Sequence, residues 1–333
     1  MLPYEVMAST AAARTTRKHF RTGMVLEKRY RLLRPLGEGG MGTVWVAEQL
    51  ALSREVAIKS LHDVAGVNRE RLRDEALALA AIHHPSVVQV FDYGETVGGL
   101  PFVVMELVRG PSLARMLATS GPLSATDAVA LMLPLLEGLD VAHGAGIVHR
   151  DLKPDNVVMA ATPGGSVPKL LDFGIAKRDR FERPALTDEG SIVGTPSYMA
   201  PEQVRGEAVD GRTDVWGAAT LLYEAVAGAP PFEASTPYRT MERIVRSPPT
   251  YPLRAAGLDG ALWVILTNAL RKDPADRVGS AAELRALLAA WRTGALQSPT
   301  NADSVQGAPR AADPSTPGES GWFDSLIRLK LDR

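Results

Sequence analysis

The residue pattern of the sequence changes from strand-forming to helix-forming close to residue 110, and that change constrains the fold more than any other feature. Before it, short stretches rich in β-branched residues alternate with turn signals, which is typical of strands. We expect five strands, over residues 30–37, 42–49, 55–61, 87–93 and 101–107. The segment 68–82 carries apolar residues at helical spacing, and from residue 112 onward helical patterns dominate, the first over 124–143. The pattern predicts an α+β fold with a small β-rich N-lobe and a larger, mainly helical C-lobe.

Composition excludes several kinds of site and partner. The 333 residues contain no cysteine, so disulfides, thiolate metal sites and cysteine nucleophiles are ruled out together. A formal net charge of −1 gives no global field that would attract nucleic acid. No stretch reaches the roughly 18 uninterrupted apolar residues of a membrane-spanning helix. We therefore expect no integral membrane segment, no nucleic-acid partner and a cytoplasmic location.

The two ends of the chain differ in composition from the lobes. Residues 1–27 are rich in Ala, Thr and Arg and predict a flexible basic N-terminal arm. Residues 293–321 are rich in Pro, Ser, Gly and Thr and predict a disordered linker. The last segment, 322–333, is a short amphipathic C-terminal element whose apolar residues fit a helix and a strand equally well. Its docking surface could be the chain itself, a partner or a membrane.

A glycine-rich turn separates the first two predicted strands. Gly37, Gly39 and Gly42 would let the backbone approach phosphates closely and point N–H groups at them. Dinucleotide-binding turns have similar glycines, but a helix follows them. Here the strand-forming residues 43–47 follow, which favours a β-hairpin over phosphates. A plain hairpin turn explains the motif equally well when it is taken alone.

Lys59 lies on the apolar third strand, where it needs an anion because lysines are almost never fully buried without a partner. Glu75 lies on the single predicted helix of the N-lobe. A Lys59–Glu75 ion pair would hold the ammonium in place for two phosphates. Taken alone, Glu75 would be an ordinary solvated residue, since arginines crowd the same helix.

The strongest chemical signal is the run His-Arg-Asp-Leu-Lys-Pro-Asp-Asn at 149–156. Asp151 can orient an attacking hydroxyl and accept its proton, and Lys153 can neutralise charge on a moving phosphoryl group. Asn156 can supply an oxygen to Mg²⁺, which prefers hard oxygen ligands. Asp172 follows a short apolar run and is well placed for a second contact to the metal.

These motifs, with Asp-Phe-Gly at 172–174 and Ala-Pro-Glu at 200–202, resemble in order and spacing the serine/threonine protein kinases of the bacterial, eukaryotic-like type. The resemblance covers residues 28–292, with the N-lobe at 28–108 and the C-lobe at 109–292. It implies the two-lobed protein kinase fold and ATP as the phosphate donor. Mg²⁺ is the implied metal, with Mn²⁺ as an alternative. Protein substrates are the implied partners, and a kinase homodimer is a further one.

The resemblance also implies a role for each site residue. Lys59 contacts the α- and β-phosphates and pairs with Glu75. Asp151 is the catalytic base, and Lys153 lies beside the γ-phosphate. Val44 and Ala57 pack on adenine from above and Val158 packs on it from below. Met105 is the gatekeeper, and the backbone of 106–108 hydrogen-bonds adenine. The implied nucleotide-binding positions are Gly37, Gly39, Gly42, Val44, Ala57, Lys59, Glu75, Glu106, Val108 and Val158. The implied metal ligands are Asn156 and Asp172.

Regulation is implied by Arg150, because kinases with an arginine before the catalytic aspartate commonly use it to bind a phosphate on the activation loop. That loop is expected at 175–199. Thr187 and Ser191 are the better candidates for autophosphorylation, and Thr195 is expected to contact the catalytic loop.

The implied activity is transfer of the γ-phosphate of Mg-ATP to Ser or Thr hydroxyls of proteins, including the chain's own activation loop. A nucleotide-binding pseudokinase scaffold is the alternative, and a small-molecule phosphotransferase is a second. The presence of every catalytic residue named above argues against the scaffold. The resemblance also implies structural roles for three residues. Asp214 resembles the buried aspartate that supports the catalytic loop, and Arg277 resembles the partner of Glu202.

Overall fold

The computed structural model describes residues 20–39, 42–61, 69–173, 196–252 and 255–296. The predicted arm up to residue 19, the linker from residue 297 and the element at 322–333 lie outside these residues. The activation-loop candidates Thr187, Ser191 and Thr195 lie outside them as well.

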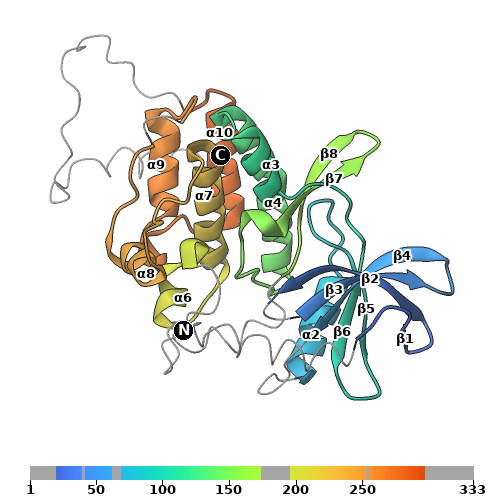
Figure 1. The fold of residues 1–333 in the computed structure, drawn as a ribbon. Helices are drawn as coiled ribbons and strands as arrows, with labels where there is room; N and C mark the ends of the chain where they lie inside the picture. The colour runs from blue at the N-terminus through green and yellow to red at the C-terminus, as the bar shows by residue number, and fades with distance from the viewer. Residues whose placement is uncertain (1–19, 40–41, 62–68, 174–195, 253–254, 297–333) are drawn as a thin grey trace, which may run out of the picture. The chain divides into compact units, whose positions relative to one another are not determined.

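Within the described residues, the N-lobe is a six-stranded antiparallel sheet with one helix (Figure 1). The strands lie in the order β1-β2-β3-β4-β6-β5. Their bounds are β1 (Val25–Leu26), β2 (Tyr30–Gly39), β3 (Gly42–Gln49), β4 (Arg54–Leu61), β5 (Val90–Glu95) and β6 (Pro101–Met105). Helix α2 (Arg69–Ala80) comes between β4 and β5 in sequence. The five predicted strands correspond to β2–β6, and the segment predicted at 68–82 is α2.

The packed part of the N-lobe begins earlier than the sequence suggested. Residues 20–27 were expected in the flexible arm, yet Phe20 is only 4% exposed and joins a cluster with Leu32, Trp45 and Phe102. The short strand β1 then pairs with β2. Burial of one aromatic side chain against the sheet outweighs the polar composition of the surrounding residues. The boundary predicted at residue 27 therefore does not match this structure.

The C-lobe is mainly helical, as expected. The helices among its described residues are α3 (Leu113–Ser120), α4 (Ala125–Gly144), α6 (Pro201–Arg205), α7 (Gly211–Ala227), α8 (Pro237–Arg246), α9 (Gly260–Ala269) and α10 (Ala281–Arg292). The 3₁₀ turns are η1 (Pro154–Asn156), η2 (Pro196–Tyr198) and η3 (Pro274–Asp276). The Ser124 hydroxyl accepts a hydrogen bond from the backbone N–H of Asp127, which confirms the predicted N-cap of α4. Helix α7 is buried along most of its length and forms the centre of this lobe.

A two-stranded hairpin, β7 (Val157–Thr162) and β8 (Gly165–Leu170), connects the two regions. Val158 of β7 forms a bridge with Ser112, and Leu170 of β8 forms one with Val87. After α10, Leu296 still packs against the C-lobe core, so the linker predicted from residue 293 begins later. Within the described residues, no helix has the length and apolar character needed to cross a membrane.

Candidate active site

One buried carboxylate holds the turn between α4 and β7. Asp214 on α7 is 1% exposed and accepts hydrogen bonds from the backbone N–H groups of His149 (2.7 Å) and Arg150 (2.8 Å). Its Oδ2 also lies 2.8 Å from Nε2 of His143. Arg150 has a φ of 64°, in a region that non-glycine residues rarely adopt. Asp214 therefore fixes a strained turn, which is the supporting role that the sequence implied for it.

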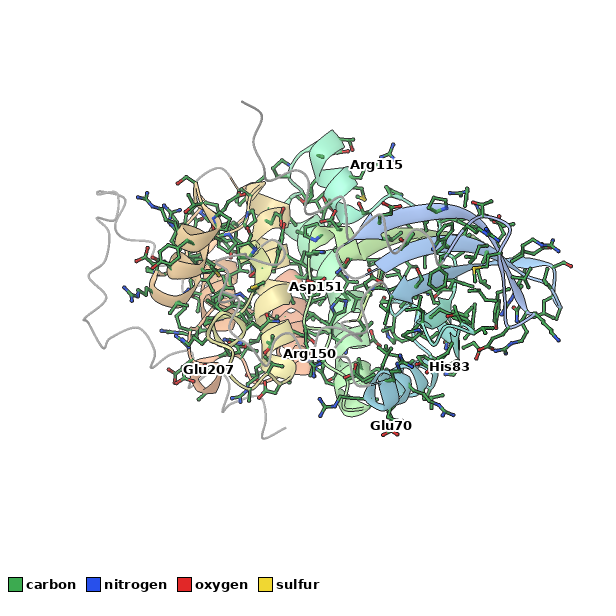
Figure 2. All side chains as sticks on the ribbon, turned by 60° about the horizontal axis from the view of Figure 1, so that its bottom comes forward. Glu70, His83, Arg115, Arg150, Asp151 and Glu207 are labelled. Carbon is green, nitrogen blue, oxygen red and sulfur yellow. The ribbon has the colours of Figure 1, made fainter. Side chains whose placement is uncertain are left out.

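The same turn presents Asp151, which Figure 2 shows close to Arg150. The amide nitrogen of Asn156 donates to the backbone oxygen of Asp151 (2.8 Å) and to its Oδ2 (2.9 Å). Nζ of Lys153 lies 3.5 Å from the same Oδ2. The structure thus brings together the predicted base, its predicted lysine and one predicted metal ligand.

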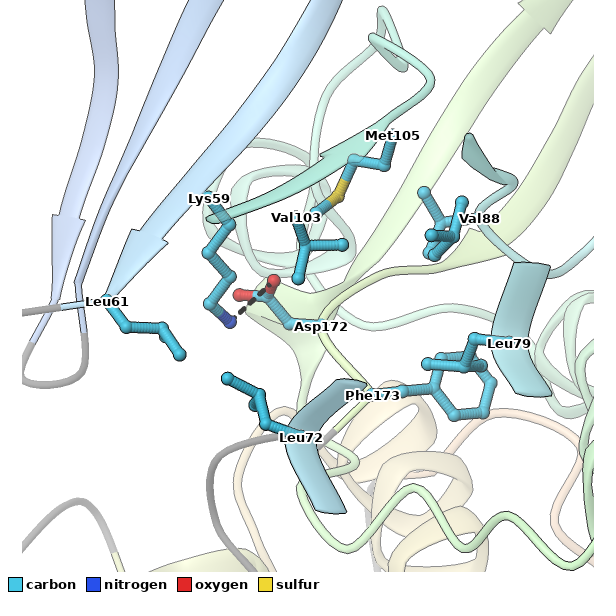
Figure 3. Close-up of a pocket in the computed structure, with 10 residues that line it drawn as sticks. Lys59, Leu61, Leu72, Leu79, Val88, Val103, Met105, Asp172 and Phe173 are labelled. Atoms are coloured by element: carbon cyan, nitrogen blue, oxygen red, sulfur yellow. Dashed lines mark ion pairs between the residues drawn. The ribbon is translucent and has the colours of Figure 1, made fainter. Parts of the chain in front are cut away.

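Lys59 and Asp172 form an ion pair in this structure (Figure 3). Nζ of Lys59, from β4, lies 2.9 Å from Oδ1 of Asp172, and the two side chains are 19% and 33% exposed. Next to the pair lies a mainly apolar pocket, to which Phe173 and the α2 residues Leu72 and Leu79 contribute (Figure 3). Two groups that the sequence assigned to phosphate and metal are therefore direct neighbours.

Glu75 has a different partner from the one predicted. Its Oε1 lies 3.8 Å from Nη1 of Arg150, and the two side chains are 18% and 7% exposed. Among the described residues no Lys59–Glu75 ion pair is present, so the predicted pairing does not match this structure. In this structure Lys59 has the carboxylate of Asp172 as an opposite charge, and Glu75 has the guanidinium of Arg150 nearby.

Asn156 and Asp172 fit a divalent cation by their chemistry. They offer an amide and a carboxylate oxygen, the hard ligands that Mg²⁺ prefers. The backbone N–H of Leu171 donates to the backbone oxygen of Asn156 (2.8 Å). This bond keeps Leu171, the residue before Asp172, beside Asn156. Groups of three or more His, Cys, Asp and Glu side chains that could hold a metal are absent from the described residues. A site here would therefore use few protein ligands, with the remainder supplied by phosphate and water.

The glycine-rich turn is a β-hairpin, as the residues after it predicted. Gly37 lies opposite Val44, and Gly39 lies opposite Gly42. A Cβ at Gly42 would collide with the backbone oxygen of Ser60, so the close approach of β4 alone requires glycine there. Nothing lies within 4 Å of a Cβ built at Gly37, so packing does not explain that glycine. Gly37 is thus the position where room for a ligand is the better explanation.

The predicted adenine-binding positions lie on strands that flank the connection after β6. Ala57 pairs with Met105 across β4 and β6, and Val44 pairs with Lys59 across β3 and β4. Glu106 and Val108 follow Met105 closely in the chain, and both are half-buried. Val158, on β7, is 8% exposed. Ala57 therefore lies beside the residue that precedes this connection, and the binding of adenine by these residues stays a prediction.

A buried ion pair anchors α6 to the C-lobe. Nη1 and Nη2 of Arg277 each lie 2.9 Å from one carboxylate oxygen of Glu202, and the side chains are 0% and 2% exposed. The predicted Glu202–Arg277 pairing is therefore present. Sequence reasoning missed Gln203, whose amide donates to the backbone oxygen of Arg150 (2.9 Å). A lone glutamine carries no sequence signal for such a contact.

Burial changes the ionisation of three side chains near these elements. It raises the pKa of Glu224, and it raises the pKa of Tyr198, to which the charge of Glu224 also contributes. Burial lowers the pKa of Lys272 to about 7, with smaller contributions from Arg277 and Arg205. The Lys272 ammonium lies 3.7 Å from the ring centroid of Phe232, a cation–π contact that favours its charged form.

Comparison with known proteins identifies the class to which this fold and site belong. The protein kinase domain family matches residues 30–287, and the chain belongs to that family. The two-lobed α+β fold that the sequence predicted is thereby confirmed, since the match spans both the strands of the N-lobe and the helices of the C-lobe.

Two similar curated relatives are bacterial. The chain is 40% identical over 273 residues to a probable serine/threonine-protein kinase of Corynebacterium efficiens. The aligned residues cover 79% of this chain and 41% of that protein. It is 38% identical over 270 residues to the serine/threonine-protein kinase PknB of Mycobacterium tuberculosis, covering 78% and 42%. The chain thus spans about two fifths of the length of these relatives. The crystal structure of a mutant form of the Mycobacterium tuberculosis PknI kinase domain is similar with a TM-score of 0.65 and 28% identity, covering 83% of this chain and 99% of that one.

Proposed function

We propose that this chain is a serine/threonine protein kinase that transfers the γ-phosphate of ATP to Ser and Thr hydroxyls of proteins, including its own activation loop. The observation that carries the proposal is the contact of Asn156 and Lys153 with the carboxylate of Asp151, in a turn held by Asp214. A positioned carboxylate beside a cation is what phosphoryl transfer to a hydroxyl requires.

Each residue has one task in the proposed reaction. Asp151 accepts the proton of the substrate hydroxyl, and Asn156 keeps its carboxylate turned toward that hydroxyl. Lys153 balances charge on the phosphoryl group as it moves. Such a reaction needs positioning and charge stabilisation more than covalent catalysis, so preformed contacts of this kind lower its barrier.

The nucleotide would lie along the glycine-rich hairpin and the connection at 106–108. Gly37, Gly39 and Gly42 would cover its phosphates, and Lys59 would contact them with its ammonium. Asn156 and Asp172 would hold Mg²⁺, which supplies positive charge to the phosphate oxygens when bound; Mn²⁺ has the same hard-oxygen preference. Glu75 would then support Lys59 from α2.

Hydroxyl amino acids of proteins are the proposed acceptors because Lys153-Pro154 resembles the serine/threonine version of the catalytic loop. The named serine/threonine kinases among the relatives support the same class of substrate. A homodimer and a cytoplasmic location remain predictions.

The test is transfer of radiolabelled phosphate from ATP to a generic protein substrate with Mg²⁺ or Mn²⁺, followed by mapping of the phosphorylated residues. Asp151→Asn should reduce turnover by about 10²–10⁴-fold, the usual contribution of a positioned base. Asp140→Asn is the matched control, because Asp140 is an exposed aspartate on α4, and it should retain full activity.

Incorporation on serine and threonine that disappears in Asp151→Asn supports the proposal. A folded wild-type chain that binds nucleotide and yields no phosphoprotein with either metal would overturn it in favour of a scaffold. Phosphorylation of a small molecule in place of protein would overturn it in favour of a small-molecule phosphotransferase.

A further inference from the structure

Three segments that are distant in sequence meet at the side chain of Glu106, directly after β6. Its Oε1 accepts a hydrogen bond from Nζ of Lys169 on β8 (2.6 Å) and another from the backbone N–H of Gln89 (2.7 Å). The backbone N–H of Glu106 donates in return to the oxygen of Gln89 (2.9 Å). Glu106 is therefore fixed through both its side chain and its backbone.

The Lys169–Glu106 pair is well shielded from water. The two side chains are 13% and 27% exposed, so solvent screens their attraction less than that of a surface pair. Nζ of Lys169 also lies 3.4 Å from the backbone oxygen of Val87. Removing one partner of a short, partly buried ion pair is destabilising, because the remaining charge keeps its desolvation cost and loses its compensation.

Gln89 extends the same network to the end of α2. Its side-chain amide donates to the backbone oxygen of Ala80, the last residue of α2 (3.1 Å), and to that of Val90 at the start of β5 (3.0 Å). The chain of contacts thus runs from α2 through Gln89 and Glu106 to Lys169.

Both ends of the charged pair belong to the proposed adenine site. Lys169 lies opposite Val158 in the β7–β8 ladder, and Val158 is the residue expected below adenine. Glu106 belongs to the connection whose backbone is expected to bind the edge of adenine. The Lys169–Glu106 pair therefore links the β7–β8 hairpin, which carries Val158, to the connection at 106–108. This link restricts the distance between the two segments.

We infer that Lys169 is a positioning residue for the nucleotide, which acts through Glu106 to hold the backbone of 106–108 at the correct distance from Val158. The inference rests on the proposed function, because it assumes that ATP binds at 106–108. Lys169 itself touches neither the phosphates nor the reacting hydroxyl in this arrangement, so its loss should affect nucleotide affinity and leave the chemical step unchanged.

The experiment measures the dissociation constant of Mg-ADP by calorimetry, and KM for ATP and kcat by phosphate transfer, for wild type, Lys169→Met and Lys169→Arg. Lys169→Met should weaken nucleotide binding and raise KM about tenfold, which corresponds to about 1.4 kcal/mol, with kcat within about twofold of wild type. Lys169→Arg, which keeps the charge, should recover most of the affinity. The control is Lys28→Met, which removes an exposed lysine of the N-lobe and should change neither constant.

Glu106→Gln provides the second arm, because it keeps the backbone and side-chain size while it removes the charge. It should weaken binding to a similar extent, and the Lys169→Met/Glu106→Gln double variant should bind no more weakly than either single variant. Additive losses would overturn the inference, and so would a fall in kcat at unchanged KM.

Failure of this inference is distinguishable from failure of the proposed function. Wild type that binds Mg-ADP and transfers phosphate, while Lys169→Met binds equally well, refutes the positioning role alone. Wild type that binds no nucleotide refutes the proposed function and this inference with it. A melting temperature that falls in Lys169→Met at unchanged affinity would assign the pair to stability only.

Discussion

The buried pair of Glu202 and Arg277 gives the sharpest stability prediction. Glu202→Gln keeps the shape of the side chain but turns one of the two 2.9 Å contacts into an encounter between two N–H donors. It also leaves a guanidinium that is 0% exposed without its counter-charge. Removing one partner of a buried ion pair typically costs about 3–5 kcal/mol. We expect the lower end, about 3 kcal/mol, because Arg277 keeps the backbone oxygens of Arg212 and Arg271 as acceptors.

The measurement is urea unfolding followed by tryptophan fluorescence, supported by thermal melting. A loss of about 3 kcal/mol should lower the melting temperature by about 6–12 °C for a domain of this size. The matched control is Glu207→Gln in the same region, labelled in Figure 2. Glu207 is 53% exposed and lies 3.6 Å from Arg205, so its loss should cost less than about 1 kcal/mol.

A double variant tests the reasoning itself. Adding Arg277→Met to Glu202→Gln removes the uncompensated buried charge, so the double variant should be more stable than Glu202→Gln alone. Two results would refute the role of the buried charge. Glu202→Gln would lower the free energy of unfolding no more than Glu207→Gln does, or the double variant would be less stable than Glu202→Gln alone by as much as Arg277→Met costs in the wild-type chain.

Three further predictions concern other parts of the chain. Phe20→Ala should cost about 3 kcal/mol, because it removes a buried aromatic side chain from the cluster on the sheet, and thermal melting would detect it. Lys59→Met should reduce phosphate transfer by at least about 100-fold, with the melting temperature little changed, because the ammonium proposed to contact phosphate is lost. Lys272 has a pKa of about 7 in the folded chain and 10.5 as its ordinary value. The unfolded chain therefore binds more protons between these values, stability should rise with pH across that window, and Lys272→Met should remove this part of the slope in urea midpoints.

Sequence patterns predicted the elements of this fold better than its contacts. The strands and helices follow from period and capping, as at Ser124, because those signals are local. The short strand β1 and the burial of Phe20 carry no such signal, since a two-residue strand forms only where a neighbouring strand already stands. The boundary of the N-lobe was therefore placed too late.

In the candidate site, contacts within one motif were predictable from the sequence, and contacts between distant elements were not. Asp151, Lys153 and Asn156 lie within one turn, so their proximity was predictable from the motif. The partner of Glu75 was not, because an ion pair between elements depends on where α2 lies relative to the catalytic turn. In this structure the guanidinium of Arg150 lies 3.8 Å from that carboxylate. Lys169 carries no functional signal in the sequence, because the pattern does not reveal that its side chain reaches Glu106.

The ion pair between Lys59 and Asp172 also has a kinetic consequence. With its ammonium 2.9 Å from a carboxylate, Lys59 presents little net positive field to an approaching anion. Lys59 should therefore contribute little electrostatic acceleration to nucleotide capture by this form. Phosphate and metal would compete with this pairing for the same two charges if they bind as proposed, so the ion pair should weaken their binding to this form.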